Sequence, residues 1–257
     1  MPARPNPFKA RLQEGKLQLG LWLALANGYT AELCAGAGYD WLLIDGEHAP
    51  NDLPRILAQL QAIGRGESHA IVRPPVGETW LLKQLLDLGA QTILVPMVES
   101  AEQAQALVRA VRYPPHGVRG IGAGLARASS FNRDAGYLQT ADNEVCLLLQ
   151  VESRAGIASL DGIAATEGVD GVFIGPADLA ADMGHLGCPN EPEVVEAVLA
   201  AIRRLGKLGK PSGLLTTDLA LARQYIETGA TFVAIGSDVG LLSGQTAALV
   251  KEFRDTL

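Results

Sequence analysis

The sequence predicts an α/β protein, a single (β/α)8 TIM barrel formed by residues 1–257. Three observations support this fold: eight short apolar runs, eight intervening segments with helical patterning, and the chain length. About 250 residues is the usual size of one such barrel. A doubly wound open sheet is the alternative, because it is built from the same alternation of strands and helices.

The expected strands are nearly continuous apolar runs rather than alternating ones. Such runs are typical of parallel strands, because both faces of each strand are covered by other parts of the protein. In chain order, the eight runs occupy residues 19–25, 41–45, 70–73, 92–95, 146–151, 171–175, 212–215 and 232–236.

Helices are expected between these runs, and start and stop signals support them. Thr79 and Asp218 are expected N-caps, and Pro192 fits the first turn of a helix. Glycine often follows the last apolar residue of a helical segment, which predicts C-caps at Gly89, Gly168, Gly209 and Gly229. The expected helices occupy residues 28–38, 52–63, 79–88, 101–111, 154–167, 192–209, 218–228 and 243–256.

The spacing between the fourth and fifth strands is unusually long. The additional residues lie in a segment from Tyr113 to Asn143 that is rich in proline, glycine and arginine. We expect this segment to form a long loop at the mouth of the barrel.

Composition and charge exclude several classes of function. The chain has 21 basic and 28 acidic residues, a formal net charge of −7. This surplus of negative charge disfavours a nucleic-acid partner and an anionic membrane surface, and it favours a small-molecule substrate. No apolar stretch reaches the roughly 18 residues of a membrane span. A chain of this size can fold without a structural metal, so a bound metal would be functional.

The cysteines and the first residues of the chain predict a cytoplasmic protein. Cys34, Cys146 and Cys188 are widely separated and form no CxxC pair, as expected for reduced thiols. The first fifteen residues lack the apolar core of a signal peptide.

Polar residues follow four of the predicted strands directly. In a barrel, catalytic groups gather at the carboxyl ends of the strands. Each of these residues alone has an ordinary structural explanation, either as a helix cap or as an ion-pair partner. Their convergence on one rim favours a functional site. The four strand ends are Asp45-Gly46-Glu47-His48, Arg73-Pro74-Pro75, Gln150-Val151-Glu152-Ser153 and Gly175-Pro176-Ala177-Asp178.

These residue types suit the chemistry of a 2-oxo acid. Two carboxylates on adjacent strands, Glu152 and Asp178, can hold Mg²⁺ or Mn²⁺ and leave positions open for a chelating substrate. Arg73 could stabilise the negative charge that develops on the substrate oxygen. His48 could transfer a proton near neutral pH.

Two further residues have alternative interpretations. Asp45 lies three residues before His48 and could orient its imidazole, or it could simply cap the strand end. Trp22, on the first strand, could pack beneath a bound metal complex or fill the core.

Schiff-base chemistry is disfavoured by the positions of the lysines. A Schiff-base lysine normally lies on a barrel strand, where burial lowers its pKa. None of the lysines falls within a predicted strand; they are Lys9, Lys16, Lys83, Lys207, Lys210 and Lys251.

The sequence around these strand ends resembles a known family, the metal-dependent class II pyruvate aldolases of the 4-hydroxy-2-oxo-heptane-1,7-dioate aldolase (hydroxyketoacid aldolase) group. The resemblance runs from about residue 7 to 250 and no functional position in the motifs is replaced. It rests on the strings GLWLALANGYTAELCAGAGYDWLLIDGEHAPND, VRPPVGE, LLDLGAQTILVPMVESAEQA, RYPPHGVRGIG, LARASSFN, QVES and GVFIGPADLAADMG.

The resemblance implies a role for each site residue. His48 would be the catalytic base, and Arg73 would stabilise the pyruvate enolate. Asp87 would raise the basicity of the histidine, from a neighbouring subunit if not from the same one. Glu152 and Asp178 would bind a divalent metal, Mg²⁺, Mn²⁺ or Co²⁺. Pyruvate would be held by Gln150 and by the backbone of Ala177 and Asp178.

The resemblance also implies the reaction and the assembly. The enzyme would reversibly cleave 4-hydroxy-2-oxo acids to pyruvate, or hydroxypyruvate, and an aldehyde such as succinate semialdehyde, in aromatic compound catabolism. It would be a homo-hexamer that exchanges its C-terminal helix between subunits.

Two other functions remain open from the residues alone. One is a lyase of the citrate-lyase or malyl-CoA type, which acts on a CoA thioester; the acidic balance of the chain argues against it. The other is a metabolite-binding barrel without catalytic activity, against which the intact set of strand-end residues argues.

Overall fold

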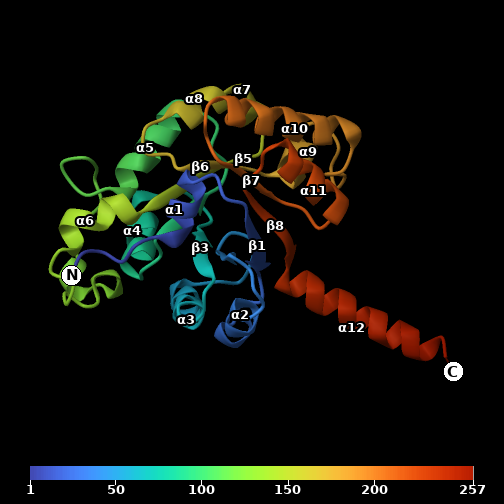
Figure 1. The fold of residues 1–257 in the computed structure, drawn as a ribbon, viewed down its shortest axis with the longest axis horizontal. Helices are drawn as coiled ribbons and strands as arrows, with labels where there is room; N and C mark the ends of the chain where they lie inside the picture. Colours follow the sequence, from blue (N-terminus) through green and yellow to red (C-terminus); the bar gives the residue numbers. More distant parts are fainter. Residues whose placement is uncertain (257) are drawn as a thin grey trace.

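The structure, a computed structural model that describes residues 1–256, is a closed barrel of parallel strands (Figure 1). The strands follow one another in chain order around the barrel, and β8 pairs with β1. This closure confirms the predicted (β/α)8 fold and excludes the open sheet. The strands are β1 (Gln18–Leu23), β2 (Trp41–Asp45), β3 (His69–Arg73), β4 (Thr92–Val95), β5 (Cys146–Val151), β6 (Gly171–Ile174), β7 (Ser212–Leu215) and β8 (Phe232–Ser237).

Helices surround the barrel as expected, with additional short ones. The sequence does not indicate α1, α6 or α9, and the helix expected at 154–167 is divided into α7 and α8. The helices are α1 (Pro7–Gln13), α2 (Gly28–Ala35), α3 (Leu53–Ile63), α4 (Thr79–Asp87), α5 (Ala101–Val111), α6 (Tyr137–Glu144), α7 (Arg154–Ala158), α8 (Leu160–Ala165), α9 (Pro176–Asp182), α10 (Pro192–Lys207), α11 (Leu219–Thr228) and α12 (Asp238–Arg254), with 3-10 turns η1 (Ala123–Leu125) and η2 (Arg127–Ser129).

Most predicted helix ends are confirmed. The Asp218 carboxylate accepts hydrogen bonds from the first backbone N–H groups of α11, and Pro192 begins α10. All four predicted C-cap glycines adopt positive φ angles. The prediction of Thr79 as an N-cap is wrong. The N–H groups of Leu81 and Leu82 both donate to the carbonyl of Glu78, so the helix begins one residue earlier.

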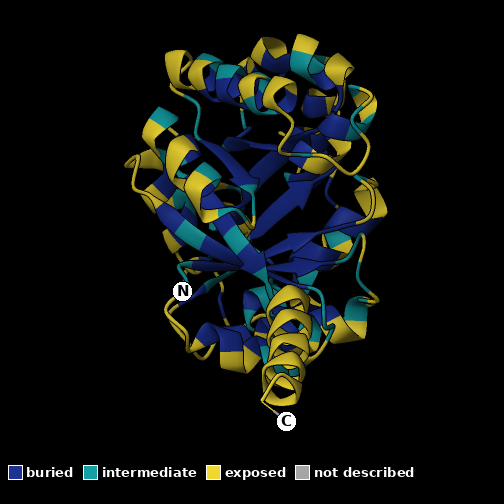
Figure 2. Ribbon diagram, turned by 90° about the vertical axis from the view of Figure 1, so that its right-hand side faces the viewer, coloured by how far each residue is buried: buried dark blue, intermediate teal, exposed yellow. Residues whose placement is uncertain are grey.

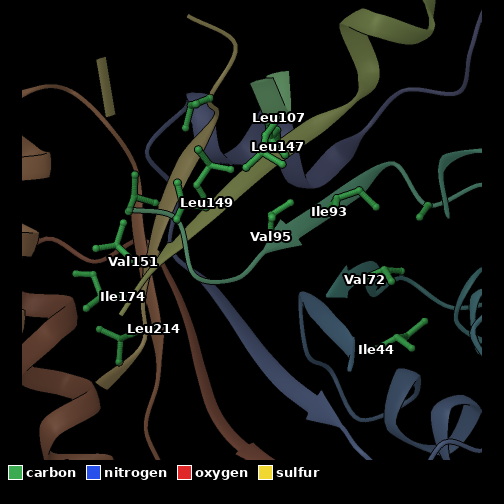
Figure 3. Packing of buried hydrophobic residues seen from close by; sticks show 14 of the residues in the cluster. Ile44, Val72, Ile93, Val95, Leu107, Leu147, Leu149, Val151, Ile174 and Leu214 are labelled. Atoms are coloured by element: carbon green, nitrogen blue, oxygen red, sulfur yellow. The ribbon is translucent and has the colours of Figure 1, made fainter. Parts of the chain in front are cut away.

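The main core lies between the outer face of the barrel and the helices. Figure 3 shows side chains of successive strands, such as Ile44, Val72 and Ile93, in this layer, and Leu107 of α5 near Leu147. Figure 2 shows the strands as buried and the outer faces of the helices as exposed. Burial on both faces explains why each strand reads as a continuous apolar run.

A second core fills the barrel interior and is rich in aromatic rings. Trp41 meets Phe232 and Trp22 edge-on, with ring centroids 6.4 and 6.3 Å apart. Gly20 is required on β1, because a Cβ atom there would overlap the Trp41 ring. Phe8 of α1 packs against Trp41 and Phe232 and closes the amino end of the barrel. The barrel interior is therefore filled at its amino end, and a ligand would enter it from the carboxyl end.

The segment 113–143 lies at the amino end of the barrel, so its predicted place at the mouth is wrong. The extra residues follow α5, and in a parallel barrel the connection from a helix to the next strand lies at the amino ends of the strands. Pro2 pairs with Gly136 in an isolated β-bridge that ties this segment to the start of the chain. Strand spacing alone does not show on which side of the helix an insertion falls.

The last helix, α12, extends away from the barrel (Figure 1). Asp238 anchors its first turn by accepting hydrogen bonds from the N–H groups of Ala24 and Leu25, at 2.8 and 3.2 Å. Beyond Asp238, every described residue of α12 is exposed, as the yellow helix in Figure 2 shows. Within residues 1–256, no helix has the length and apolar character needed to cross a membrane.

Candidate active site

A cavity of about 340 Å³ opens at the carboxyl end of the barrel and collects most of the predicted site residues. The polar strand ends of β2, β3, β5 and β6 reach it together, as expected from the barrel topology. Trp22, Phe173, Leu215 and Tyr225 form its apolar part. Its polar lining includes His48, Arg73, Gln150, Glu152, Ala177 and Asp178.

Arg73 and Asp45 form a two-pronged ion pair at the floor of this region. Arg73 Nε donates to Asp45 Oδ1 at 3.0 Å and Nη2 donates to Oδ2 at 2.8 Å. Trp22 supports the pair: its indole N–H donates to Asp45 Oδ2 at 3.2 Å, and Arg73 Cζ lies 5.1 Å from its ring centroid. Burial alone would raise the pKa of Asp45, but the hydrogen bonds and charge of Arg73 outweigh it and hold the pKa below its ordinary value.

Glu47 provides a second carboxylate that contacts Arg73, and no role for it was predicted from the sequence. Its Oε2 lies 2.8 Å from Arg73 Nη1. The same oxygen accepts no well-aligned hydrogen bond within the described chain, so its contact with Arg73 is an ion pair. Burial raises the pKa of Glu47, and the charges of Arg73 and His48 oppose that rise. Its position between Asp45 and His48, at a strand end, was the one indication in the sequence that Glu47 belongs to the site.

His48 lies at the rim of the cavity with an exposed imidazole. Its side chain is 67% exposed, and Nε2 is 3.7 Å from Glu47 Oε2. Asp45 does not contact the ring: its Oδ1 accepts the backbone N–H groups of Glu47 and His48, at 3.0 and 3.4 Å. The structure thus pairs Asp45 with Arg73 and with the turn that carries the histidine.

Glu152 is a buried carboxylate in this site without a basic partner among residues 1–256. Its Oε1 accepts the backbone N–H of Met97 at 2.9 Å, and its Oε2 accepts the side-chain amide of Gln150. Met97 adopts a φ of 55°, an unfavourable conformation for a residue with a side chain, and thereby directs its N–H at the carboxylate. Burial raises the pKa of Glu152 to about 7, against these hydrogen bonds, and the nearby Asp178 and Glu47 add to the rise.

Asp178 and Ala177 lie in the first turn of α9, which follows β6, the strand next to the one that precedes Glu152. Both are exposed to the cavity. The first hydrogen bond within α9 runs from the N–H of Leu179 to the carbonyl of Gly175. The N–H groups of Ala177 and Asp178 precede that bond, as expected at a helix start, and such groups can bind an anion.

The donor set fits a hard divalent cation. The negative charge of Asp178 adds to the rise in pKa of both Glu47 and Glu152, and Glu47 adds to that of Glu152. A cation would relieve that repulsion, and carboxylate oxygens are the ligands that Mg²⁺ prefers. Gln150 Oε1 is buried without a hydrogen-bond partner in the described chain, which is a second sign that the site accommodates a ligand. No group of three or more His, Cys, Asp or Glu side chains that could hold a metal ion forms within residues 1–256, so the side chains of one chain would supply at most two such ligands.

Asp87 does not join this site within one chain. It is the last residue of α4 and lies at the amino end of the barrel, whereas His48 lies at the carboxyl end. Its Oδ1 accepts a hydrogen bond from Arg119 Nη2 at 2.8 Å, and its side chain is 26% exposed. Any contact between Asp87 and an imidazole must therefore come from another copy of the chain.

Comparison with known proteins shows the family of this chain. Residues 18–244 match the family described as HpcH/HpaI aldolase/citrate lyase. The chain belongs to this family. Among its relatives, a hydroxypyruvate/pyruvate aldolase of Pseudomonas aeruginosa is 58% identical over 249 residues, which is 97% of this chain and 93% of the relative. A 4-hydroxy-2-oxo-heptane-1,7-dioate aldolase of Klebsiella pneumoniae is 53% identical over 248 residues, 96% and 94% of the two chains.

Solved structures of HpcH/HpaI family members have the same fold. A family member from Burkholderia cenocepacia has a TM-score of 0.93 and 42% identity, and the match covers 97% of this chain and 99% of that one. An HpcH/HpaI aldolase from Desulfitobacterium hafniense has a TM-score of 0.88 and 31% identity, with 96% of each chain covered. The resemblance to hydroxyketoacid aldolases is confirmed, and so is the expected class of enzyme, an aldehyde-lyase.

Proposed function

We propose that this HpcH/HpaI family member is a divalent-metal-dependent pyruvate aldolase. It reversibly cleaves 4-hydroxy-2-oxo acids to pyruvate or hydroxypyruvate and an aldehyde. The observation that supports this proposal is that one cavity contains both negatively charged carboxylates and a positively charged guanidinium. The buried carboxylate of Glu152, near Asp178, suits a metal ion, while the buried guanidinium of Arg73 suits an oxyanion.

Glu152 and Asp178 are the proposed metal ligands. A bound Mg²⁺, Mn²⁺ or Co²⁺ would polarise the 2-oxo group and make the enolate accessible. Gln150 holds the Glu152 carboxylate in place through its side-chain amide. The free N–H groups of Ala177 and Asp178 would receive the substrate carboxylate at the start of α9.

Arg73 is the proposed group for stabilising the enolate oxygen. Asp45 fixes its orientation through two hydrogen bonds, and the Trp22 ring supports it from below. Nη1 takes no part in the two hydrogen bonds to Asp45 and lies beside Glu47, so it is the Arg73 nitrogen proposed to donate to a substrate oxygen. A donor fixed before the reaction stabilises developing charge without having to reorient.

His48 is the proposed base, and Asp87 from a neighbouring subunit is its proposed partner. The exposed imidazole at the rim can reach both a substrate hydroxyl in the cavity and a residue from outside. The Asp87 carboxylate is held by the fully buried Arg119, which stacks 4.4 Å above the Tyr113 ring. This arrangement fixes the carboxylate on the surface, in the way that an intersubunit contact requires.

The proposed assembly is a homo-hexamer in which α12 is exchanged between subunits. Helix α12 presents a row of exposed apolar side chains that its own barrel does not cover: Leu241, Leu242, Leu249, Val250 and Phe253. An isolated helix with exposed leucines is poorly stable in water, whereas packing on another copy would bury them.

The protein is proposed to be cytoplasmic, since Cys34 and Cys146 are buried thiols and Cys188 is also unpaired.

Substrate turnover tests this function against its alternatives. We expect release of pyruvate from a 4-hydroxy-2-oxo acid, and exchange of the pyruvate methyl protons in D₂O when Mg²⁺ is present. Faster turnover of a CoA thioester would favour a citrate-lyase type of enzyme. Binding of metal and pyruvate without proton exchange would show a binding protein without catalysis.

A further inference from the structure

A second cavity, of about 350 Å³, lies at the amino end of the barrel, opposite the candidate active site. It is enclosed by the starts of β3 and β4, the ends of α3 and α4, and the segment that follows η1. Its walls are partly apolar, with Leu60, Ile63, Leu86 and Phe131. The charged residues of its lining are Arg4, Arg127, Arg133 and Glu144.

The three arginines of this cavity have no carboxylate partners. Within residues 1–256, none of the ion pairs includes Arg4, Arg127 or Arg133. Glu144, the single acid of the lining, accepts the backbone N–H of Asn6 at 2.7 Å. The cavity is therefore cationic in a chain whose net charge is −7.

Two of these cations lie close to each other. Burial and the charge of Arg4 both lower the pKa of Arg127. Arg127 Nη1 donates to the carbonyl of Leu88 at 2.9 Å, just beyond α4, and its guanidinium packs over Gly89. That contact explains the position of Arg127. It does not explain why Arg4 and Arg133 line the same cavity.

The remaining polar lining is neutral and already engaged. His69 is buried, and burial lowers its pKa to about 4, so its ring is uncharged near neutral pH. Its Nε2 lies 2.7 Å from Thr92 Oγ1. The Gln91 side-chain amide donates to the carbonyl of Arg4 at 2.6 Å and fixes the backbone of that residue. Among residues 1–256, no hydrogen bond involves the guanidinium of Arg4 or Arg133, so both of these groups are left to bind a ligand.

We infer that this cavity binds a small organic anion, a carboxylate or phosphate group on an apolar body, at a site separate from the active site. Arg4, Arg127 and Arg133 would bind the anionic group, because the planar guanidinium matches carboxylate and phosphate oxygens. The wall formed by Leu60, Ile63, Leu86 and Phe131 would bind the apolar body. Such a ligand would relieve the repulsion between the arginines and join the segment after η1 to the barrel.

Calorimetric titration of the full chain tests this site with two anionic probes, phenyl phosphate and benzoate, and with neutral benzyl alcohol. We expect both anions to bind more tightly than benzyl alcohol. Whichever of phenyl phosphate and benzoate binds more tightly identifies the preferred anionic group. We expect Arg4→Gln and Arg133→Gln each to weaken anion binding by about tenfold, as for loss of a charge-assisted hydrogen bond. Both side chains are on exposed residues, so both variants are expected to fold.

A matched arginine at the other end of the barrel serves as the control. Arg154 begins α7 near the mouth, and its side chain is 72% exposed. We expect Arg154→Gln to leave anion binding unchanged, and all three variants to retain aldolase activity. The proposal is overturned if no anion binds, if inorganic phosphate binds as tightly as phenyl phosphate, or if Arg154→Gln weakens binding while Arg4→Gln and Arg133→Gln do not. None of these results bears on the aldolase reaction.

Discussion

Arg73 and Asp45, from adjacent strands, form a buried ion pair through two parallel hydrogen bonds of 3.0 and 2.8 Å. The register of the barrel places them side by side, because Asp45 is the Cα partner of Arg73 in the β2–β3 ladder. The pair lies beneath the candidate active site. Its geometry therefore links the stability of the barrel to the position of the proposed enolate-stabilising group.

Replacing Asp45 with Asn is expected to lower both stability and activity. The substitution removes the carboxylate that accepts both hydrogen bonds from the buried Arg73 and leaves Glu47 as its ion-pair partner, so we expect a cost of about 3 kcal/mol. Urea unfolding measures the free energy, and a pyruvate-release assay measures the rate. The matched control is Glu196→Gln, which removes an exposed pair with Arg203 and is expected to cost about 1 kcal/mol or less. Equal effects of the two substitutions would contradict the proposed importance of the buried pair.

Replacing Arg73 with Lys is expected to reduce the aldolase rate by about two to three powers of ten. Lysine retains the charge but cannot form the two-pronged pair with Asp45 and also direct a nitrogen at the substrate. Steady-state kinetics on a 4-hydroxy-2-oxo acid measure the loss. A near-normal rate would remove Arg73 from the mechanism.

The metal-free protein is expected to become less stable as the pH rises from about 4.5 to about 7. The pKa of Glu152 is about 7 in the fold, above its ordinary value of 4.5. Between those values the folded state binds more protons than the unfolded state, so the free energy of unfolding falls with increasing pH. Thermal unfolding across this range measures the effect. In Glu152→Gln the decline should be shallower, and an unchanged decline would assign it to other groups.

Added Mg²⁺ is expected to reverse this trend. A metal binds the ionised carboxylates, so the increase in thermal stability that it causes should be larger at pH 8 than at pH 5.5. The same scans with and without metal measure it. Glu152→Gln should show little increase at either pH, and a full increase in that variant would exclude Glu152 as a ligand.

Complementation between inactive chains tests the proposed intersubunit role of Asp87. His48→Ala and Asp87→Ala are each expected to be inactive alone. Mixed assemblies would contain sites with both residues intact, His48 from one chain and Asp87 from the next, so activity should reappear after co-expression. The absence of any recovery in confirmed mixed assemblies would contradict a shared site.

Charged substitutions on α12 are expected to dissociate the assembly. Leu249→Asp with Phe253→Asp would place carboxylates among side chains that are 68% and 65% exposed in the single chain. Light scattering should then report a smaller mass than for the unaltered protein. Leu208→Asp, at an exposed leucine just after α10, is the control and should leave the mass unchanged. An unchanged mass in the α12 variant would exclude helix exchange as the basis of assembly.

The fold was largely predictable because parallel strands buried on both faces leave continuous apolar runs. Once the barrel was predicted, the strand-end residues could be predicted as a site, because the topology brings the carboxyl ends of the strands to one rim. Two features could not be predicted from the residues. The contact of Glu47 with Arg73 depends on the fold, and Asp87 looks in the sequence like an ordinary helical residue, since its proposed role requires another subunit. The segment 113–143 was misplaced because spacing between strands does not show on which side of α5 the insertion lies.

The dependence of pyruvate release on a divalent metal tests the proposed function most directly. A 4-hydroxy-2-oxo acid is supplied before and after thorough chelation with EDTA, and Mg²⁺, Mn²⁺ or Co²⁺ is then restored. We expect activity to disappear with chelation, to return with metal, and to be insensitive to borohydride added with substrate. Activity that survives chelation, or that borohydride and substrate abolish, would contradict a metal-dependent mechanism built on Glu152 and Asp178.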